Sequence, residues 1–221
     1  NDSLPSGADL ELVNPDSHAD VFHRLTVAQS ETCTVGGTTP SATLAATRTP
    51  TGTATPNLTP SATPTATPVP QSVTLQPGVA GYAGVDDATL SSWNGGDETM
   101  GSTTRLSIRP FDVWAGVLRF DLAGAIPPGA LIQSATLDLN VVSRSNSSNW
   151  ADVGVFPLLR PWDESRVSWN RASSAVAWTI PGANGIGSDR SDVMLDEQRL
   201  DQVAVWESFD VTSAVRNWVS G

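Results

Sequence analysis

"ALIQSATLDLNVV", residues 130–142, decides the fold class, because apolar and polar side chains alternate along it. The apolar positions are Leu137, Leu139 and Val141, and the polar positions between them are Thr136, Asp138 and Asn140. A period of two residues is typical of a β-strand with one buried face. We therefore predict a strand here, with its leucines turned toward a hydrophobic core.

Similar short stretches recur through residues 71–221, separated by Gly, Pro, Asn and Ser. They are ATLSSW (88–93), RLSI (105–108), AGVLRFDL (115–122), DVGVFPLL (152–159) and RVSWN (166–170). The alternation is less clean in AGVLRFDL, where Leu118 follows Val117 directly. Many short strands with turn residues between them are typical of an antiparallel sandwich or barrel. Residues 71–221 are therefore predicted to form one all-β domain.

One stretch favours a helix instead. In FDVTSAVRNWV (209–219), Val211, Val215 and Trp218 recur at the i, i+4 and i+7 positions of a single apolar stripe. Asp210 stands where its carboxylate can cap the helix. Trp162, Trp169 and Trp218 lie within apolar motifs and are predicted to be core residues.

The first 38 residues are too few to bury a core of their own. They nevertheless contain two strand-like pieces, ADLELV (8–13) and DVFHRLTVA (20–28). In the second piece, one face carries Val21, His23, Leu25 and Val27. Such a strand must pair with a sheet, either that of its own chain or, as a donor strand, that of another copy. Head-to-tail donation produces a filament when the rotation between copies does not close.

Residues 39–70 form eight tetrapeptides, and each begins with threonine. These are Thr39, Thr43, Thr47, Thr51, Thr55, Thr59, Thr63 and Thr67. The proline content favours a polyproline II rod, which over 32 residues extends roughly 100 Å. Thr and Ser with Pro are typical of O-glycosylated stalks. We expect covalent glycans on these threonines; the alternative is an unmodified, flexible linker.

Three Asn-x-Ser/Thr triplets add candidate N-glycosylation sites at Asn1, Asn57 and Asn146. Asn57 is the most interesting of the three, because it lies within the tetrapeptide array. Asn146 follows the strand predicted over 130–142.

The charge of the chain excludes some partners. The formal net charge is -11, and all 12 basic residues are arginine. Nucleic-acid binding needs clustered basic residues, so we expect none. No apolar run approaches the roughly 20 residues that cross a bilayer, so no membrane span is predicted. Cys33 is the only cysteine, either an inert thiol or an intermolecular bridge. A chain that begins at Asn1 suggests a mature secreted form or a fragment.

The motifs AGVLRFDLAGAIPPGALIQSATLDLNVV, PWDESRVSWN and WESFDVTSAVRNWVSG together resemble the DNRLRE domain family, over about residues 85–221. This resemblance implies a jelly-roll-like antiparallel β-sandwich, an extracellular setting and, in some members, polysaccharide binding. It does not imply catalysis. The hexapeptide Asp-Asn-Arg-Leu-Arg-Glu itself is absent from the chain.

Two tryptophans are candidates for sugar binding. Trp93 is followed by Asn94 and Asp97, so a sugar ring stacked on the indole would meet polar neighbours. Trp150, which follows a Ser/Asn-rich run, is the second candidate. The alternative for each is a tryptophan that covers the edge of the core.

Enzymatic chemistry finds little support. Both histidines, His18 and His23, lie outside residues 71–221, so no His-based triad or zinc motif can be formed within that domain. Asp86 and Asp87 are candidates for a structural calcium ion, without the spacing of a known calcium loop. No other cofactor is expected.

Two functions follow from these features. The first is a non-enzymatic structural subunit of an extracellular, glycosylated fibril or cell-surface appendage, which assembles with copies of itself by strand addition. The second is a carbohydrate-binding module on a stalk, within a secreted system that acts on polysaccharides.

Overall fold

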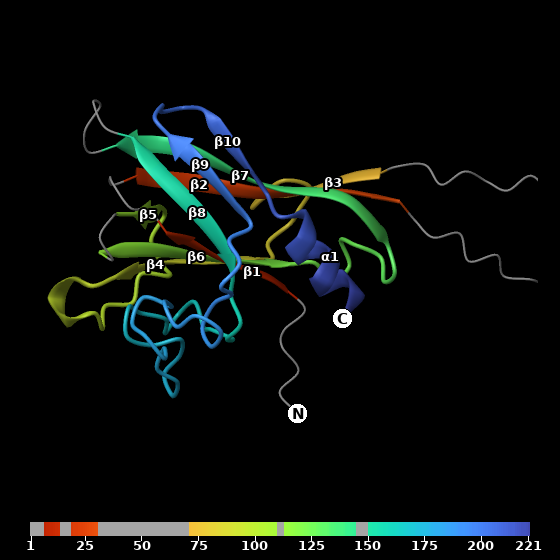
Figure 1. Ribbon diagram of the computed structural model, residues 1–221. Coiled ribbons are helices and arrows are strands. Elements are labelled where there is room, and N and C mark those ends of the chain that lie inside the picture. Colours follow the sequence, from red (N-terminus) through yellow and green to blue (C-terminus); the bar gives the residue numbers. More distant parts are fainter. Residues whose placement is uncertain (1–6, 14–18, 31–70, 110–112, 145–149) are drawn as a thin grey trace, which may run out of the picture.

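A computed structural model describes residues 7–13, 19–30, 71–109, 113–144 and 150–221 of the chain (Figure 1). Within these ranges the protein is mostly β: two antiparallel sheets and one short α-helix, without a closed barrel. For these ranges, the prediction of a mostly β fold with antiparallel sheets is therefore confirmed. The Thr/Pro segment at 39–70 and Cys33 lie outside the described residues, so the predicted rod stays a prediction.

The first sheet, sheet A, has the strand order β4-β6-β1-β8-β9. Its strands in chain order are β1 (Gly7–Val13), β4 (Val85–Ser91), β6 (Trp114–Asp121), β8 (Ala151–Pro157) and β9 (Asp196–Leu200). The N-terminal strand β1 occupies the centre, since it pairs with β6 along one edge and with β8 along the other.

The second sheet, sheet B, has the order β10-β7-β2-β3, and β5 also pairs with β2. Its strands in chain order are β2 (Ala19–Ser30), β3 (Gln71–Leu75), β5 (Leu106–Ile108), β7 (Leu131–Arg144) and β10 (Trp206–Asp210). Both strand-like pieces predicted in the first 38 residues are confirmed. Each lies inside a sheet of its own chain (Figure 1).

Strand β2 forms the longest strand pairing in sheet B, which is with β7. It follows β7 over its whole length, from the Ala19–Arg144 pair to the Ser30–Leu131 pair. Its other edge is shared: β5 pairs up to Val21, and β3 pairs from Leu25 onward. In the described part of the chain, residues 22–24 have no strand beside them on this edge. The sheet is therefore interrupted there.

One hydrophobic core takes side chains from both sheets. Its largest fully buried members include Phe120 on β6, Phe209 on β10, Leu25 on β2, and Leu137 and Leu139 on β7. The alternation read from residues 130–142 is confirmed, because Leu137, Leu139 and Val141 are all buried. Asp138 is also buried, on the opposite face, where it accepts hydrogen bonds from Arg24 and Ser208.

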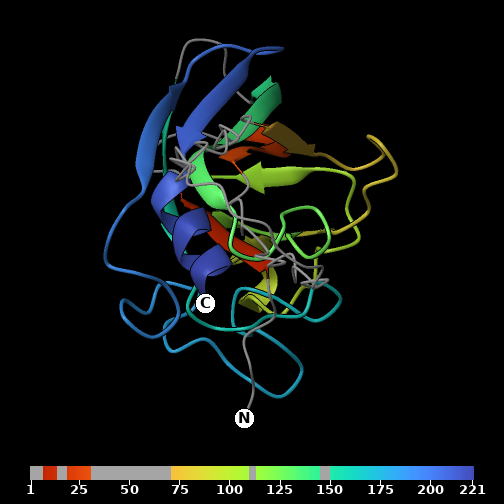
Figure 2. The same cartoon turned by 90° about the vertical axis from the view of Figure 1, so that its right-hand side faces the viewer.

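Apolar and polar residues alternate less cleanly along β6, because both faces of this strand pack against buried side chains. Leu118 and Phe120 belong to the main core, whereas Val117 belongs to a second cluster of buried residues. That second cluster is completed by residues 158–190, which we call the tryptophan loop because it contains Trp162, Trp169 and Trp178. Figure 2 shows its blue-green ribbon looping beneath the sheets.

The strand predicted over RVSWN (166–170) was wrong, because this stretch belongs to the tryptophan loop. Its backbone groups bond within turns and to other loops: the Ser168 N–H donates to Arg171 O, and the Gly182 N–H donates to Trp169 O. Val167 and Trp169 are buried through this irregular path. Apolar residues here indicated burial correctly but not the backbone conformation.

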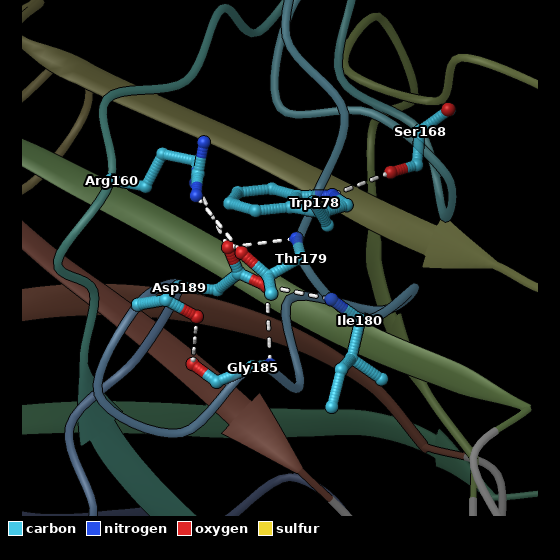
Figure 3. A network of polar contacts seen from close by, with 8 residues as sticks. Arg160, Ser168, Trp178, Thr179, Ile180, Gly185 and Asp189 are labelled. Carbon is cyan, nitrogen blue, oxygen red and sulfur yellow. Dashed lines mark hydrogen bonds and ion pairs between the residues drawn. The ribbon is translucent and has the colours of Figure 1, made fainter.

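Asp189 organises the tryptophan loop from its interior (Figure 3). This fully buried carboxylate accepts hydrogen bonds from the N–H groups of Thr179, Ile180 and Gly185 at 3.0–3.1 Å, and Arg160 Nε donates to it at 2.8 Å. A Cβ on Gly185 would stand 2.4 Å from the carboxylate, so only glycine fits. The buried negative charge of Asp189 is thus stabilised by four hydrogen-bond donors, three backbone N–H groups and the Arg160 guanidinium.

The chain ends in α1 (Thr212–Ser220), which confirms the predicted helix. Val215 is buried in the main core, and Trp218 packs against it while partly exposed. The N-cap position is Val211, which makes no side-chain capping bond; Asp210, one residue earlier, accepts the Thr212 N–H through Oδ1 at 2.8 Å. In the described ranges, no helix has the length and apolar character that a bilayer crossing requires.

Candidate functional site

Trp93 stands on a short turn that immediately follows β4. The turn is a 3₁₀ segment, Trp93–Gly95, closed by the Gly96 N–H donating to Trp93 O at 3.0 Å. Its backbone requires positive φ at Asn94 (53°) and Gly96 (79°), values that Asn and Gly tolerate better than other residues. The turn leaves the Trp93 side chain 46% exposed.

Asn170 of the tryptophan loop holds this turn in place. Its Nδ2 donates to Gly95 O at 2.8 Å and to Asp97 Oδ1 at 3.0 Å, while its N–H donates to Gly96 O at 3.1 Å. Sequence reasoning missed Asn170 as a site residue, since 75 positions separate it from Gly95. Its place at the end of the WDESRVSWN motif was the only available signal.

The indole of Trp93 is supported from behind. Its ring centroid lies 4.6 Å from that of Trp114 in an edge-to-face arrangement, and the Arg109 guanidinium lies 4.9 Å from the ring. Trp114 is itself fixed, because its Nε1 donates to Ser91 Oγ at 2.8 Å. The predicted set Trp93, Asn94 and Asp97 is therefore brought together as an exposed aromatic ring with exposed polar neighbours.

Trp150 lies apart from this turn. It precedes β8, and two strands, β6 and β1, separate β8 from β4 in sheet A. The ring is 44% exposed and is contacted by the Arg199 guanidinium at 4.7 Å. Arg199 also forms an ion pair with Asp152 at 2.9 Å. The two candidate sugar-binding tryptophans thus occupy separate places and do not form one site.

Asp86 and Asp87 have different partners, because neighbouring strand residues point to opposite faces. Asp86 forms an ion pair with Arg119. Asp87 faces His23, with Oδ2 at 3.6 Å from Nε2. Burial, followed by the charges of Glu164 and Asp86, raises the pKa of Asp87 to about 6. The described ranges hold no group of three or more His, Cys, Asp or Glu arranged to bind a metal.

The predicted donor-strand face lies in sheet B of its own chain. Leu25 and Val27 are completely buried, and His23 is 8% exposed. Val21 pairs with Val141 and Leu106 through its backbone. Burial lowers the pKa of His23 to about 4, so the imidazole is neutral at physiological pH. Leu25 and Val27 are therefore part of the core that both sheets share.

The candidate glycosylation sites lie outside the described residues. This applies to all eight threonines of the tetrapeptide array and to Asn1, Asn57 and Asn146. Glycosylation at these positions stays a prediction from the sequence.

Comparisons of the chain with protein-family models, with curated proteins and with solved structures found no match. The resemblance to DNRLRE domains therefore rests on the quoted motifs alone.

Proposed function

We propose that this chain is a non-enzymatic structural subunit of an extracellular, glycosylated fibril or cell-surface appendage. In this proposal the fold is a jelly-roll-like β-sandwich, and copies join head to tail by exchanging β1 and β2. The observation that carries the proposal is the position of these two strands at the centres of both sheets, combined with the length of chain that tethers them.

Removing β1 and β2 would leave two gaps in the domain. β6 and β8 would lose their shared neighbour in sheet A, and β7 would lose its partner along twelve residues in sheet B. Unpaired strand edges and an opened core are unfavourable in water. Residues 71–221 therefore need a two-strand insert, and an identical segment from another copy provides the same contacts as their own.

The tether is far longer than the gap it crosses. Gln29 and Gln71 are directly paired, so β2 and β3 are adjacent antiparallel strands, yet 40 residues connect Ser30 to Gln71. Hairpins of this kind need only two to five residues. A stiff polyproline II rod would hold its two ends far apart, which favours insertion into a neighbour over insertion into its own body.

Glycans on the threonine array would strengthen this preference. Sugars attached at every fourth residue would surround the rod and resist its bending back. The extracellular setting follows from this chemistry and from the DNRLRE resemblance. Glycan mass is tested by comparing the intact mass of native protein with the mass of its sequence, before and after chemical removal of O-linked sugars.

A disulfide test distinguishes the two modes of insertion. Thr26 and Thr74 are directly opposite each other on β2 and β3. In protein with Thr26→Cys, Thr74→Cys and Cys33→Ser, oxidation should join the two positions. Exchange between copies predicts a ladder of covalent multimers on a denaturing gel, whereas insertion within one chain predicts monomers.

The matched control is Thr26→Cys with Cys33→Ser, which lacks the second thiol and should give no ladder. Monomers alone at every concentration, together with monomeric mass by light scattering, would contradict the fibril proposal.

The second candidate function is carbohydrate binding at Trp93. The observation that favours it is the exposed indole, supported by Trp114 and Arg109 on a turn held by Asn170. A rigid aromatic ring beside exposed amide and carboxylate groups suits the apolar face and hydroxyls of a sugar.

Affinity electrophoresis in gels with embedded polysaccharides tests this function. Trp93→Ala should abolish retardation, and Val193→Ala, which truncates an exposed apolar side chain elsewhere, is the control. The idea fails if no polysaccharide retards the protein or if Trp93→Ala migrates as the unmodified chain does.

A further inference from the structure

An Asn-Gly pair forms the centre of the turn at residues 93–96, which we call the Trp93 turn. Asn94 and Gly95 are both exposed. A Cβ built on Gly95 would meet no atom of the described part of the chain within 4 Å, apart from its sequence neighbours. The chain contains a second Asn-Gly pair, Asn184-Gly185 in the tryptophan loop. Because the two pairs have the same dipeptide sequence, their surroundings in the fold decide which of them reacts.

An Asn-Gly pair can modify itself, because the backbone nitrogen of the glycine can attack the carbonyl carbon of the asparagine side chain. A bond forms between this nitrogen and Cγ, the bond from Cγ to Nδ2 breaks, and the proton of the nitrogen leaves with Nδ2 as ammonia. Water then opens the resulting five-membered imide. Opening at Cγ gives aspartate, and opening at the backbone carbonyl gives isoaspartate. Glycine favours the attack, since it has no side chain to hinder the close approach.

The backbone of the Trp93 turn is one peptide rotation away from the geometry of this attack. Asn94 has φ 53° and ψ 30°, and Gly95 has φ 87°, which match the central residues of a type I′ turn. Rotation of the peptide plane between them gives a type II′ turn, in which ψ of the first central residue is about −120°. At this ψ the Gly95 nitrogen eclipses Asn94 Cβ and is closest to Cγ.

The rotation leaves the rest of the turn in place. Gly95 tolerates the change of its φ from positive to negative, because glycine populates both regions. Asn170 keeps its hydrogen bonds to Gly95 O and Gly96 O, since these carbonyls belong to the following peptide planes. Within the described ranges, the Asn94 side-chain amide has no hydrogen-bond partner, so it is free to turn toward the Gly95 nitrogen.

The pair in the tryptophan loop is held against the same rotation. Gly185 is buried, and its N–H donates to Asp189 Oδ2 at 3.1 Å. Asn184 is held as well, because its N–H donates to Ile180 O at 3.1 Å and its Nδ2 donates to Pro181 O at 3.2 Å. Rotation of this peptide plane would remove one donor from the buried Asp189 carboxylate, which is unfavourable. The fold therefore protects Asn184.

We propose that Asn94 is a site of self-catalysed deamidation, at which the Gly95 nitrogen displaces ammonia and water opens the imide. Both products alter the Trp93 turn. Aspartate adds a negative charge next to Trp93 in the chain, and isoaspartate adds a carbon atom to the backbone of the turn. The modification is independent of fibril assembly and of sugar binding, and it gives the turn a second chemical state that accumulates as the protein ages.

The test is incubation of the folded full chain in water enriched in ¹⁸O, at mildly alkaline pH because the attacking nitrogen must lose its proton. Proteolysis in ordinary water and mass spectrometry follow. ¹⁸O enters the new carboxyl when water opens the imide, so the label separates deamidation during incubation from deamidation during proteolysis. We expect labelled product at Asn94 to form about tenfold faster or more than at Asn184, whose peptide plane is hydrogen-bonded to a buried carboxylate.

Unfolding in urea is the matched control, since it removes the tertiary contacts of both pairs. In urea, Asn94 and Asn184 should react at similar rates. Asn94→Gln keeps an amide but would need a larger ring, so label at this position should disappear while label at Asn184 is unchanged. Equal rates at the two pairs in the folded chain, or no label at Asn94, would overturn the proposal. A difference that persists in urea would also count against it, because that difference would come from flanking residues and not from the fold.

Discussion

His23 and Asp87 respond to burial in opposite directions. The pKa of His23 falls from 6.5 to about 4, so its contribution to stability is present above pH 6.5 and is lost as the pH falls toward 4. The pKa of Asp87 rises from 3.8 to about 6, so its contribution is present below pH 3.8 and is lost as the pH rises through 6. Between pH 6 and 4 the two effects offset each other.

Asp87→Asn should remove this compensation. Between pH 7 and pH 4 the free energy of unfolding of the variant should fall further than that of the unmodified protein, by up to about 3 kcal/mol. Urea denaturation at several pH values measures the difference. The charged neighbours Glu164, Asp86 and Arg105 are present in both proteins, so their contributions largely cancel in the comparison.

Asp192→Asn is the control, since it removes an exposed carboxylate. Parallel pH profiles for Asp87→Asn and the unmodified chain would show that the two groups do not compensate.

At the scale of elements, the tryptophan loop buries apolar side chains as a strand or helix does, although it contains neither. Burial alone would raise the pKa of Asp189, but hydrogen bonds from Thr179, Ile180 and Arg160 outweigh it and lower the pKa. The conformation of the loop therefore depends on an ionised Asp189 carboxylate that accepts all of these hydrogen bonds.

Asp189→Asn should destabilise the protein by roughly 3 kcal/mol, because the amide cannot pair with Arg160 and turns a donor toward donors. The loss should appear in urea denaturation followed by tryptophan fluorescence, given the three buried indoles of this loop. In the unmodified chain the same stability should decline as the pH falls below about 4, the ordinary range of the carboxyl.

Asp163→Asn provides a matched change, since this exposed loop carboxylate accepts only from Ser165. A loss for Asp189→Asn no larger than that of Asp163→Asn would mean that the network does not hold the loop.

Helices and strands whose apolar residues recur at a regular spacing were predictable from the sequence, and those without such spacing were not. Leu137, Leu139 and Val141 marked β7, and the apolar stripe through Val215 marked α1, because local pattern and burial agree there. β3, β9 and β10 were not predicted, since they are five-residue strands without a strong pattern.

The Trp93 site was predicted in part for the same reason. The turn residues Trp93 to Gly96 are contiguous, whereas Asn170 and Arg109 reach the turn only through the fold. Contacts across long sequence separations leave no periodic signal.

At the scale of the whole molecule, the N-terminal strands β1 and β2 are members of the two sheets, β1 in sheet A and β2 in sheet B. Sequence reasoning identified both strands and the face with Leu25 and Val27, but it could not choose their places within the sheets. Order within a sheet is decided by long-range pairing, here between β2 and a strand more than one hundred residues away.

The Gln29–Gln71 pair has a mechanical consequence for an assembled fibre. Both linkers would leave each folded body at the same corner, so tension would run from one linker to the next past the body. The load would peel β2 from β3, breaking one residue pair at a time.

Single-molecule pulling should therefore open the β2–β3 pair at lower force when handles are attached at Gln29 and Gln71 than at Gln29 and Leu75, which loads all pairs at once. Equal forces would show that β7 alone bears the load. Under tension, such a fibre would lengthen by reversible opening of the β2–β3 pair in each domain. The rest of each folded domain would bear little of the force.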